Sequence, residues 1–153
     1  MDASTELQLF GKIIIAAFLG GLVGLEREVA ERPAGLRTHM LVCATSSFLV
    51  TLATLMVTSF DPQNLINTDP IRVVEAIIVG ISFLGAGTIL KYNREGEKTV
   101  EGLTTSASIL SVSAIGIAVA LNVFILAIGV TLLNLFINWG VYYIISRARA
   151  STE

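Results

Sequence analysis

The sequence predicts an all-α integral membrane protein, a bundle of five transmembrane helices that forms one domain over residues 1–153. The chain is 54% hydrophobic and only 14% charged, whereas charged residues make up about 25% of a typical soluble domain. Its apolar runs approach or reach the roughly 20 residues that a helix needs to cross the hydrocarbon core of a bilayer. We therefore expect lipid, rather than water, to surround most of the chain.

The apolar runs give the positions of the five helices. We predict them at residues 7–25, 38–58, 73–90, 103–120 and 123–145. The last two come from a single block without a charged residue, 103–145. At 1.5 Å per residue this block would form a helix of about 65 Å, roughly two hydrocarbon cores. The block must therefore turn, and we place the turn at Asn122, with a re-entrant segment as the alternative.

The basic residues predict how the bundle is oriented in the membrane. They gather in the first connection, the third connection and the tail: Arg27, Arg32, Arg37, Lys91, Arg94, Lys98, Arg147 and Arg149. The second connection contains only Arg72, and the fourth contains none. Because basic segments stay on the cytoplasmic side, we predict an outside N-terminus and a cytoplasmic C-terminus in the cytoplasmic (inner) membrane. Trp139, Tyr142 and Tyr143 are expected to form an aromatic belt at the inner interface.

Several classes of function do not fit this sequence. A net charge of −2 gives no basic field for a nucleic acid. The chain has one cysteine, Cys43, and one histidine, His39, so a Cys/His zinc cluster is excluded. It also contains no nucleophile elbow and no phosphate-binding loop. We predict that the protein is not an enzyme and has no cofactor.

Three of the predicted helices carry stripes of polar side chains. The stripes lie on the second, fourth and fifth helices and consist of Ser47, Thr51, Thr54 and Thr58, then Thr104, Ser108 and Ser111, then Thr131, Asn134, Asn138 and Tyr142. A polar group in hydrocarbon requires a partner, so such faces should point at other helices. The stripes predict either hydrogen bonds between helices or the lining of a path for a solute.

Small residues predict close contacts between helices. Gly20 and Gly24 form a G-x-x-x-G face in the first helix, which favours tight packing within a protomer or between protomers. A homo-oligomer, with a dimer favoured, is therefore expected. Gly85 and Gly87 in the third helix either pack closely or break the helix and present backbone groups to an ion.

Arg72 and Glu75 lie one helical turn apart at the start of the third helix. An ion pair at the level of the headgroups accounts for them without a function. Alternatively, Glu75 binds a cation or carries a proton at an outer mouth, since an ionisable residue near the membrane often marks a site.

The segment "GLEREVAERPAGLRTHM" (residues 24–40) holds the densest group of ionisable side chains. Its candidate residues are Glu26, Arg27, Glu28, Arg32, Arg37, Thr38 and His39. If the first helix continues past residue 25, Glu28 and Arg27 extend its glycine faces, and Glu28–Arg32 and Arg27–Glu31 are spaced for ion pairs. The segment serves topology and structural pairing, or it is a functional polar cluster at the inner face. Glu28 and Glu75 are weak candidates for Mg²⁺ ligands, but the arginines nearby favour a gate or a partner-binding patch over a magnesium site.

Four motifs stand in order along the chain, namely "GGLVGLERE" (20–28), "RPAGLRTHMLV" (32–42), "IVGISFLGAGTIL" (78–90) and "GLTTSASI" (102–109). Together they resemble the MgtC/SapB family of bacterial membrane proteins. The resemblance implies a small multi-span protein of the cytoplasmic membrane that is linked to growth under magnesium limitation. It also implies regulation of membrane partners, among them the proton-translocating ATP synthase.

The sequence departs from that family in three places. Glu75 and Ala76 stand where the family favours Ala-Gln, and Glu101 stands where a basic residue often precedes "GLTT". Many members also carry a soluble C-terminal domain, for which the tail after Ser146 is too short. The additional acid keeps cation binding open, whereas the short tail argues against a cytosolic sensing role.

These observations lead to three hypotheses of function. The first is a non-enzymatic regulator that supports Mg²⁺ and ion homeostasis through membrane partners. The alternative is a small transporter or channel for Mg²⁺, another cation or a solute, with the polar stripes lining its path. The third is a purely structural oligomeric scaffold.

Overall fold

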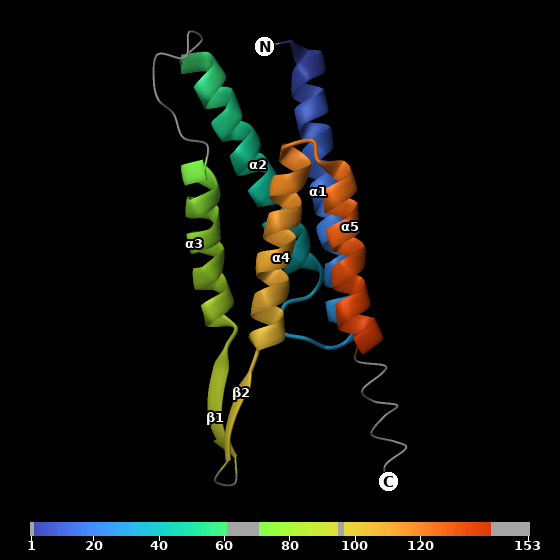
Figure 1. The fold of residues 1–153 in the computed structure, drawn as a ribbon, viewed down its shortest axis with the longest axis vertical. Coiled ribbons are helices and arrows are strands. Elements are labelled where there is room, and N and C mark those ends of the chain that lie inside the picture. Colours follow the sequence, from blue (N-terminus) through green and yellow to red (C-terminus); the bar gives the residue numbers. More distant parts are fainter. Residues whose placement is uncertain (1, 61–70, 95–96, 142–153) are drawn as a thin grey trace.

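The computed structural model describes residues 2–60, 71–94 and 97–141, and it confirms the all-α class (Figure 1). Within these residues, successive helices run in opposite directions along one bundle. They are α1 (Ala3–Val29), α2 (Leu36–Phe60), α3 (Ile71–Gly87), α4 (Leu103–Ala120) and α5 (Phe124–Leu135). A short π-helical segment, Phe136–Val141, continues α5.

Some of the helices have the length and surface of membrane spans. Among the described residues, three helices are long and apolar enough to cross a bilayer: α1, residues Leu36–Thr58 of α2, and α4. A shorter apolar stretch covers Phe124–Gly140. Large apolar side chains cover the outside of the bundle, among them Phe83 and Ile125, which is 91% exposed. Such an outer surface suits lipid tails, while the orientation of the bundle in the membrane stays a prediction.

A β-hairpin follows α3 and was not predicted. Strand β1 (Leu90–Arg94) pairs antiparallel with β2 (Glu97–Glu101). The hairpin extends beyond the helices at the end of the bundle that also carries the α1–α2 connection (Figure 1), and we call this the hairpin end. The predicted third helix, 73–90, is therefore wrong at its C-terminal end, because the chain leaves the helix at Gly87, a poor helix former.

The core lies where α1, α2 and α4 meet, and the glycine face of α1 is part of it. A Cβ atom at Gly20 would lie 2.6 Å from Cβ of Cys43 and from the carbonyl oxygen of His39. A Cβ atom at Gly24 would lie 2.8 Å from Cα of Leu36. The predicted close packing is thus formed inside the protomer, between α1 and α2. The homo-oligomer stays a prediction, and this face does not support it.

The long uncharged block turns where the sequence indicated. Asn122 adopts a left-handed conformation with φ of 63°, which asparagine tolerates better than most residues. Its backbone N–H donates to the carbonyl oxygen of Val119, and α5 then runs back beside α4 (Figure 1). The predicted turn is confirmed. The part of the predicted fifth helix after Val141, with Tyr142, Tyr143 and the basic tail, lies outside the described residues.

Candidate functional site

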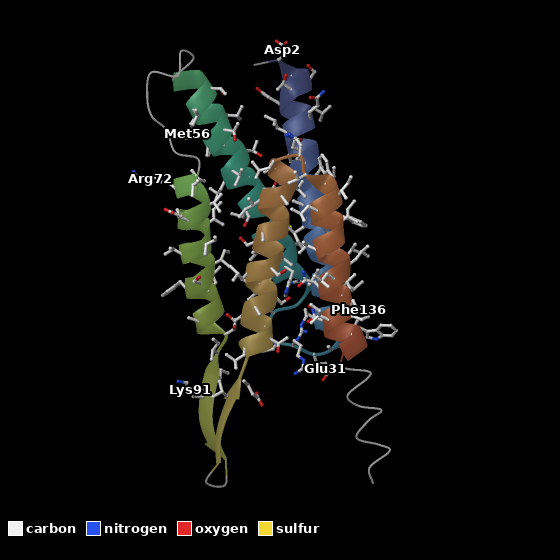
Figure 2. All side chains as sticks on the ribbon, viewed as in Figure 1. Asp2, Glu31, Met56, Arg72, Lys91 and Phe136 are labelled. Carbon is white, nitrogen blue, oxygen red and sulfur yellow. The ribbon has the colours of Figure 1, made fainter. Side chains whose placement is uncertain are left out.

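Most of the predicted site residues meet at the hairpin end of the bundle. They come from the end of α1, the connection, the starts of α2 and α4, and the last helical segments: Glu26, Arg27, Glu28, Arg32, Arg37, Thr38, His39, Thr104, Ser108, Asn134 and Asn138. Arg72 and Glu75 lie at the opposite end, where α3 begins. Figure 2 labels Arg72 there and Glu31 at the hairpin end. The two groups of candidates are therefore separate.

Glu28 holds the start of α2. Its Oε2 accepts a hydrogen bond of 2.9 Å from the backbone N–H of Leu36, the first residue of that helix. The contact depends on Gly35, because a Cβ atom there would collide with the Glu28 carboxylate. An acceptor at this position satisfies one of the free amides at a helix N-terminus. Arg37, in contrast, is exposed on the outside of α2. Glu28 therefore bonds within the protein, while Arg37 faces its surroundings.

The two predicted ion pairs of this segment, Glu28–Arg32 and Arg27–Glu31, are not formed. The four-residue spacing holds only while the chain stays helical. Here α1 ends at Val29, and Glu31 adopts a left-handed conformation with φ of 54°. The prediction is wrong because the helix ends before the second partner of each pair.

His39 connects α2 to α4 at the same end. Its side chain is fully buried, and its Nδ1 lies 2.9 Å from the Gly35 carbonyl oxygen. A carbonyl oxygen only accepts, so Nδ1 carries the proton and Nε2 of the neutral ring accepts from Ser108 Oγ at 2.8 Å. The distance suits a nucleophile and its base. However, both side chains are buried and neither lines the hollows beside them, so the pair serves as a link between helices.

Arg27 is a buried charge with an incomplete set of partners. It extends the glycine face of α1, as predicted, and is only 4% exposed. Its NH1 lies 3.7 Å from Glu26 Oε2, which is the one ion pair found in the described part of the chain. Its Nε has no hydrogen-bond partner among the described residues. Burial of a guanidinium is expensive unless its N–H groups find acceptors.

A polar cleft adjoins Arg27. It consists of two hollows of about 510 and 600 Å³ that share Arg27, Arg32 and Asn138. Trp139 and Glu26 line the first hollow, and the second is bordered by the end of β2 and the start of α4: Glu101, Gly102, Leu103, Thr104 and Thr105. The amide nitrogen of Asn138 also has no partner among the described residues. The sequence predicted Arg27 and Arg32 in one polar cluster and Thr104 and Asn138 in two separate stripes, but it did not indicate the hairpin that brings Glu101 and Gly102 beside them.

The polar stripes have two different outcomes. Between α4 and α5 one expected bond forms, since the Asn134 side-chain amide donates to Ser111 Oγ at 2.8 Å, whereas the Thr131 hydroxyl donates to the Ala127 carbonyl oxygen of its own helix. On α2 the expectation is wrong for the three threonines, whose hydroxyls donate to backbone carbonyls of the preceding turn in α2 itself. Such bonds satisfy a hydroxyl without a second helix. The contact from α2 to α4 is made instead by Ser46 and Ser113, whose Oγ atoms lie 3.0 Å apart.

The predicted features of α3 are also changed by the structure. The helix is continuous through Gly85, so a break at that residue is wrong. Gly85 packs instead against Ser106 of α4, where a Cβ atom would collide with the hydroxyl. At the other end of α3, Arg72 and Glu75 are both exposed and form no ion pair with each other.

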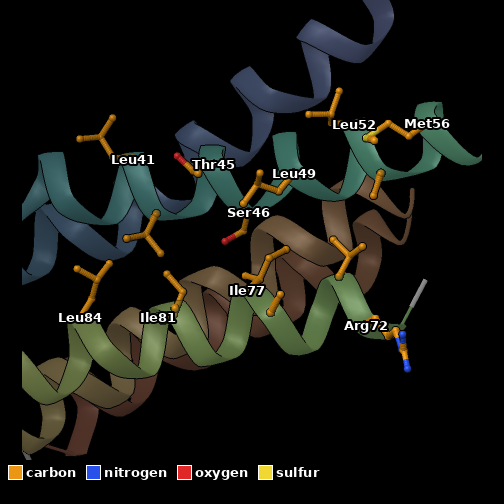
Figure 3. A pocket seen from close by; sticks show the side chains of 15 residues that line it. Leu41, Thr45, Ser46, Leu49, Leu52, Met56, Arg72, Ile77, Ile81 and Leu84 are labelled. Carbon is orange, nitrogen blue, oxygen red and sulfur yellow. The ribbon is translucent and has the colours of Figure 1, made fainter. Parts of the chain in front are cut away.

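An apolar groove of about 650 Å³ lies between α2 and α3 (Figure 3). Leu49 of α2 and Ile77 and Ile81 of α3 are among the side chains that border it, and Arg72 lies at its end. Gly80 also lines the groove, and a Cβ atom there would meet nothing within 4 Å. The α3 side of the protein is therefore less closely packed than the contact of α1 with α2.

The described residues offer little for a metal ion. They contain no group of three or more His, Cys, Asp or Glu side chains placed to hold one. Of the two predicted candidates, Glu28 is engaged with α2, and Glu75 is exposed at the opposite end. Mg²⁺ is usually bound by only one or two carboxylates together with water or phosphate, so these residues alone do not define a magnesium site.

Comparison with known proteins gives consistent relatives. The model of the MgtC family matches residues 13–146. Protein MgtC of Salmonella typhimurium strain LT2 is 39% identical over 126 residues, which cover 82% of this chain and 49% of the relative. Protein SapB of Bacillus subtilis is 36% identical over 107 residues, 70% of this chain and 45% of the relative. YhiD of Escherichia coli K12, which bears the provisional name of a magnesium transporter, is 30% identical over 126 residues, 82% of this chain and 57% of the relative.

The chain thus spans about half the length of these curated relatives. No solved structure gave a match.

Proposed function

The chain belongs to the MgtC family, and from this premise we propose that it is a non-enzymatic regulator in the cytoplasmic membrane. In this proposal it supports Mg²⁺ and ion homeostasis by binding partner proteins within the bilayer. The partner is an integral membrane protein that presents a transmembrane helix, a class that includes ion-translocating complexes such as the ATP synthase. The link to Mg²⁺ homeostasis comes from the family.

The proposal rests on the position of the open space in the structure, which lies on the outside of the bundle between two helices. Several polar side chains inside the bundle bond across helices, as in the pairs His39–Ser108 and Ser111–Asn134, and others bond to the backbone of their own helix, as Thr51 and Thr131 do. A hollow of about 650 Å³ lies instead on the outside, as the apolar groove between α2 and α3. This arrangement supports binding of an apolar partner from the membrane more than conduction of an ion through the bundle.

The groove has dimensions and a lining that fit a transmembrane helix. The lining residues of α3 run from Arg72 to Leu84, a helical length of about 18 Å, which is more than half of a hydrocarbon core of about 30 Å. Ala76 and Gly80 both line it. Small residues let two helix backbones approach closely, and this is how helices associate in lipid.

Photo-crosslinking in native membranes tests the proposal. A photoreactive residue at Met56, which lines the groove, should crosslink one defined membrane protein, whereas the same residue at Ile125, exposed on α5, should not. Gly80→Leu should fill the groove and reduce that product about tenfold. Gly129→Leu is the matched control, since Gly129 also has nothing within 4 Å and lies on α5. Equal crosslinking by both glycine variants, or none in the parent, contradicts the proposal.

Transport is the second candidate, and it is favoured by the provisional name of the relative YhiD. It is tested with purified protein in liposomes that carry a Mg²⁺ gradient or a H⁺ gradient. Flux that Glu75→Gln abolishes would replace the regulator with a transporter. Absence of flux for both ions would exclude transport of Mg²⁺ and of H⁺ as the function of this protein.

A further inference from the structure

The polar cleft at the hairpin end has hydrogen-bond donors that lack acceptors. Arg27 is 4% exposed, and its Nε has no partner among the described residues. The side-chain amide of Asn138, in the π-helical segment, is in the same condition. Both residues line both hollows of the cleft. Since buried donors are nearly always satisfied in proteins, these two point to a missing acceptor.

The N-terminus of α4 opens into the same cleft. Leu103, Thr104 and Thr105 are its first three residues, and all of them line the larger hollow. Gly102 precedes them in a left-handed conformation with φ of 90°, and no side chain caps the helix. The first backbone N–H groups of a helix lack intrahelical partners and carry partial positive charge, which favours an anion.

The charges around the cleft allow an anion to bind. Arg27 and Arg32 supply two positive charges. Glu26 lies 3.7 Å from one terminal nitrogen of Arg27, which leaves the Nε edge of the guanidinium free of it. Glu101 is the second acid of the lining and is exposed to solvent. Glu26 Oε2 is itself buried without a hydrogen-bond partner among the described residues, so the two arginines stand against one buried acid, which is paired with Arg27, and one exposed acid.

We propose that the polar cleft binds a phosphate group, held by Arg27, Arg32, Asn138 and the N-terminus of α4. A phosphate offers several acceptor oxygens to donors that come from α1, the α1–α2 connection, the π-helical segment and the start of α4, and arginine is the side chain best matched to it. The cleft lies at the hairpin end of the bundle, which the basic residues predict to lie at the inner interface, beside lipid headgroups and the aqueous phase. The phosphate therefore belongs to a phospholipid headgroup or to a free phosphate anion. This site is separate from the α2/α3 groove, so the test of the phosphate site is independent of the test of the regulator proposal.

The only tryptophan of the chain, Trp139, lines the cleft and reports binding. The purified protein is prepared in a maltoside detergent, which contains no phosphate. One titration uses inorganic phosphate against chloride at constant ionic strength. A second uses phosphatidylglycerol against diacylglycerol, which has similar chains and no phosphate. We expect a saturable change in tryptophan fluorescence in at least one titration.

Two arginines of the same segment provide matched variants. Arg32 lines the cleft and Arg37 does not, and both are exposed, so that both substitutions should fold. Arg32→Gln should weaken binding about tenfold or more, because it removes a charge-assisted contact, whereas Arg37→Gln should leave it unchanged. Asn138→Leu should weaken binding as well.

The outcomes separate the sources of the phosphate. A response to inorganic phosphate identifies a free anion, and a response only to phosphatidylglycerol identifies a headgroup. In either case, the proposal requires that binding of the probe is weakened in the Arg32 and Asn138 variants and not in the Arg37 variant. No response to either probe overturns the proposal. Equal weakening by Arg32→Gln and Arg37→Gln also overturns it, because it would show attraction by net charge alone.

Discussion

Substitution of Gly24 by alanine should separate α1 from α2. A Cβ atom at this position would lie 2.8 Å from Cα of Leu36 and 2.8 Å from Cβ of His39, whereas carbon atoms in contact prefer about 3.5–4.0 Å. Neither atom can rotate away, since both are fixed to the backbone of α2, so the helices must part by up to about 1 Å. Overpacking of this kind costs about 1–3 kcal/mol.

Alanine also favours the helix over glycine by about 1 kcal/mol, and this gain must be removed from the comparison. Gly80→Ala provides the control, because Gly80 is helical and a Cβ atom there meets nothing within 4 Å. The propensity gain is common to both variants, so the difference between their free energies of unfolding should be about 1–3 kcal/mol. Reversible unfolding in mixed micelles measures it. A difference below about 0.5 kcal/mol would refute the packing argument, since that is the range of substitutions that touch nothing.

Two further substitutions test the links between helices at the hairpin end. Ser108→Ala should lower the free energy of unfolding by about 1–3 kcal/mol, because it leaves the buried Nε2 of His39 without a donor. Ser82→Ala is the control, since this exposed serine bonds within α3, and it should change the free energy of unfolding by less than about 0.5 kcal/mol. An equal decrease in the free energy of unfolding of the two variants would contradict the role of the His39–Ser108 bond as a link between α2 and α4. Glu28→Ala should lower the free energy of unfolding by about 0.5–2 kcal/mol, because α2 loses the acceptor at its first residue. Glu28→Gln keeps a side-chain oxygen and should lower it less in the same unfolding assay. A larger loss of stability for the glutamine variant would indicate that the charge of Glu28 matters rather than the hydrogen bond.

Much of the architecture follows from patterns that are local in the sequence. The helices occur where apolar runs approach the thickness of a bilayer, and the chain turns at Asn122 because the uncharged block is too long for one crossing. Burial of Arg27 was also predictable, since it continues the face of Gly20 and Gly24 by whole helical turns. These inferences depend only on the period of the α-helix and on the thickness of the surrounding bilayer.

The remaining features depend on which elements become neighbours. Glu28 has the right spacing to pair with Arg32, yet it caps α2, because the end of α1 at Val29 turns the chain back toward its carboxylate. The stripe of α2 likewise has the right spacing to face a helix, but a threonine hydroxyl is satisfied equally well by its own backbone. Periodicity shows which side chains share a face and not which partner each one chooses.

The polar groups at the hairpin end differ in how completely they are satisfied, and this difference separates structure from function. His39 uses both ring nitrogens, and the Glu28 carboxylate accepts from the start of α2, so these residues explain how three helices are joined. Arg27 and Asn138 lie in the same region, yet each has a donor with no acceptor among the described residues. A protein that only needed to hold its helices together would gain stability by replacing such groups with apolar ones. A ligand that supplies the missing acceptor therefore explains these two groups beside an open cleft better than packing does.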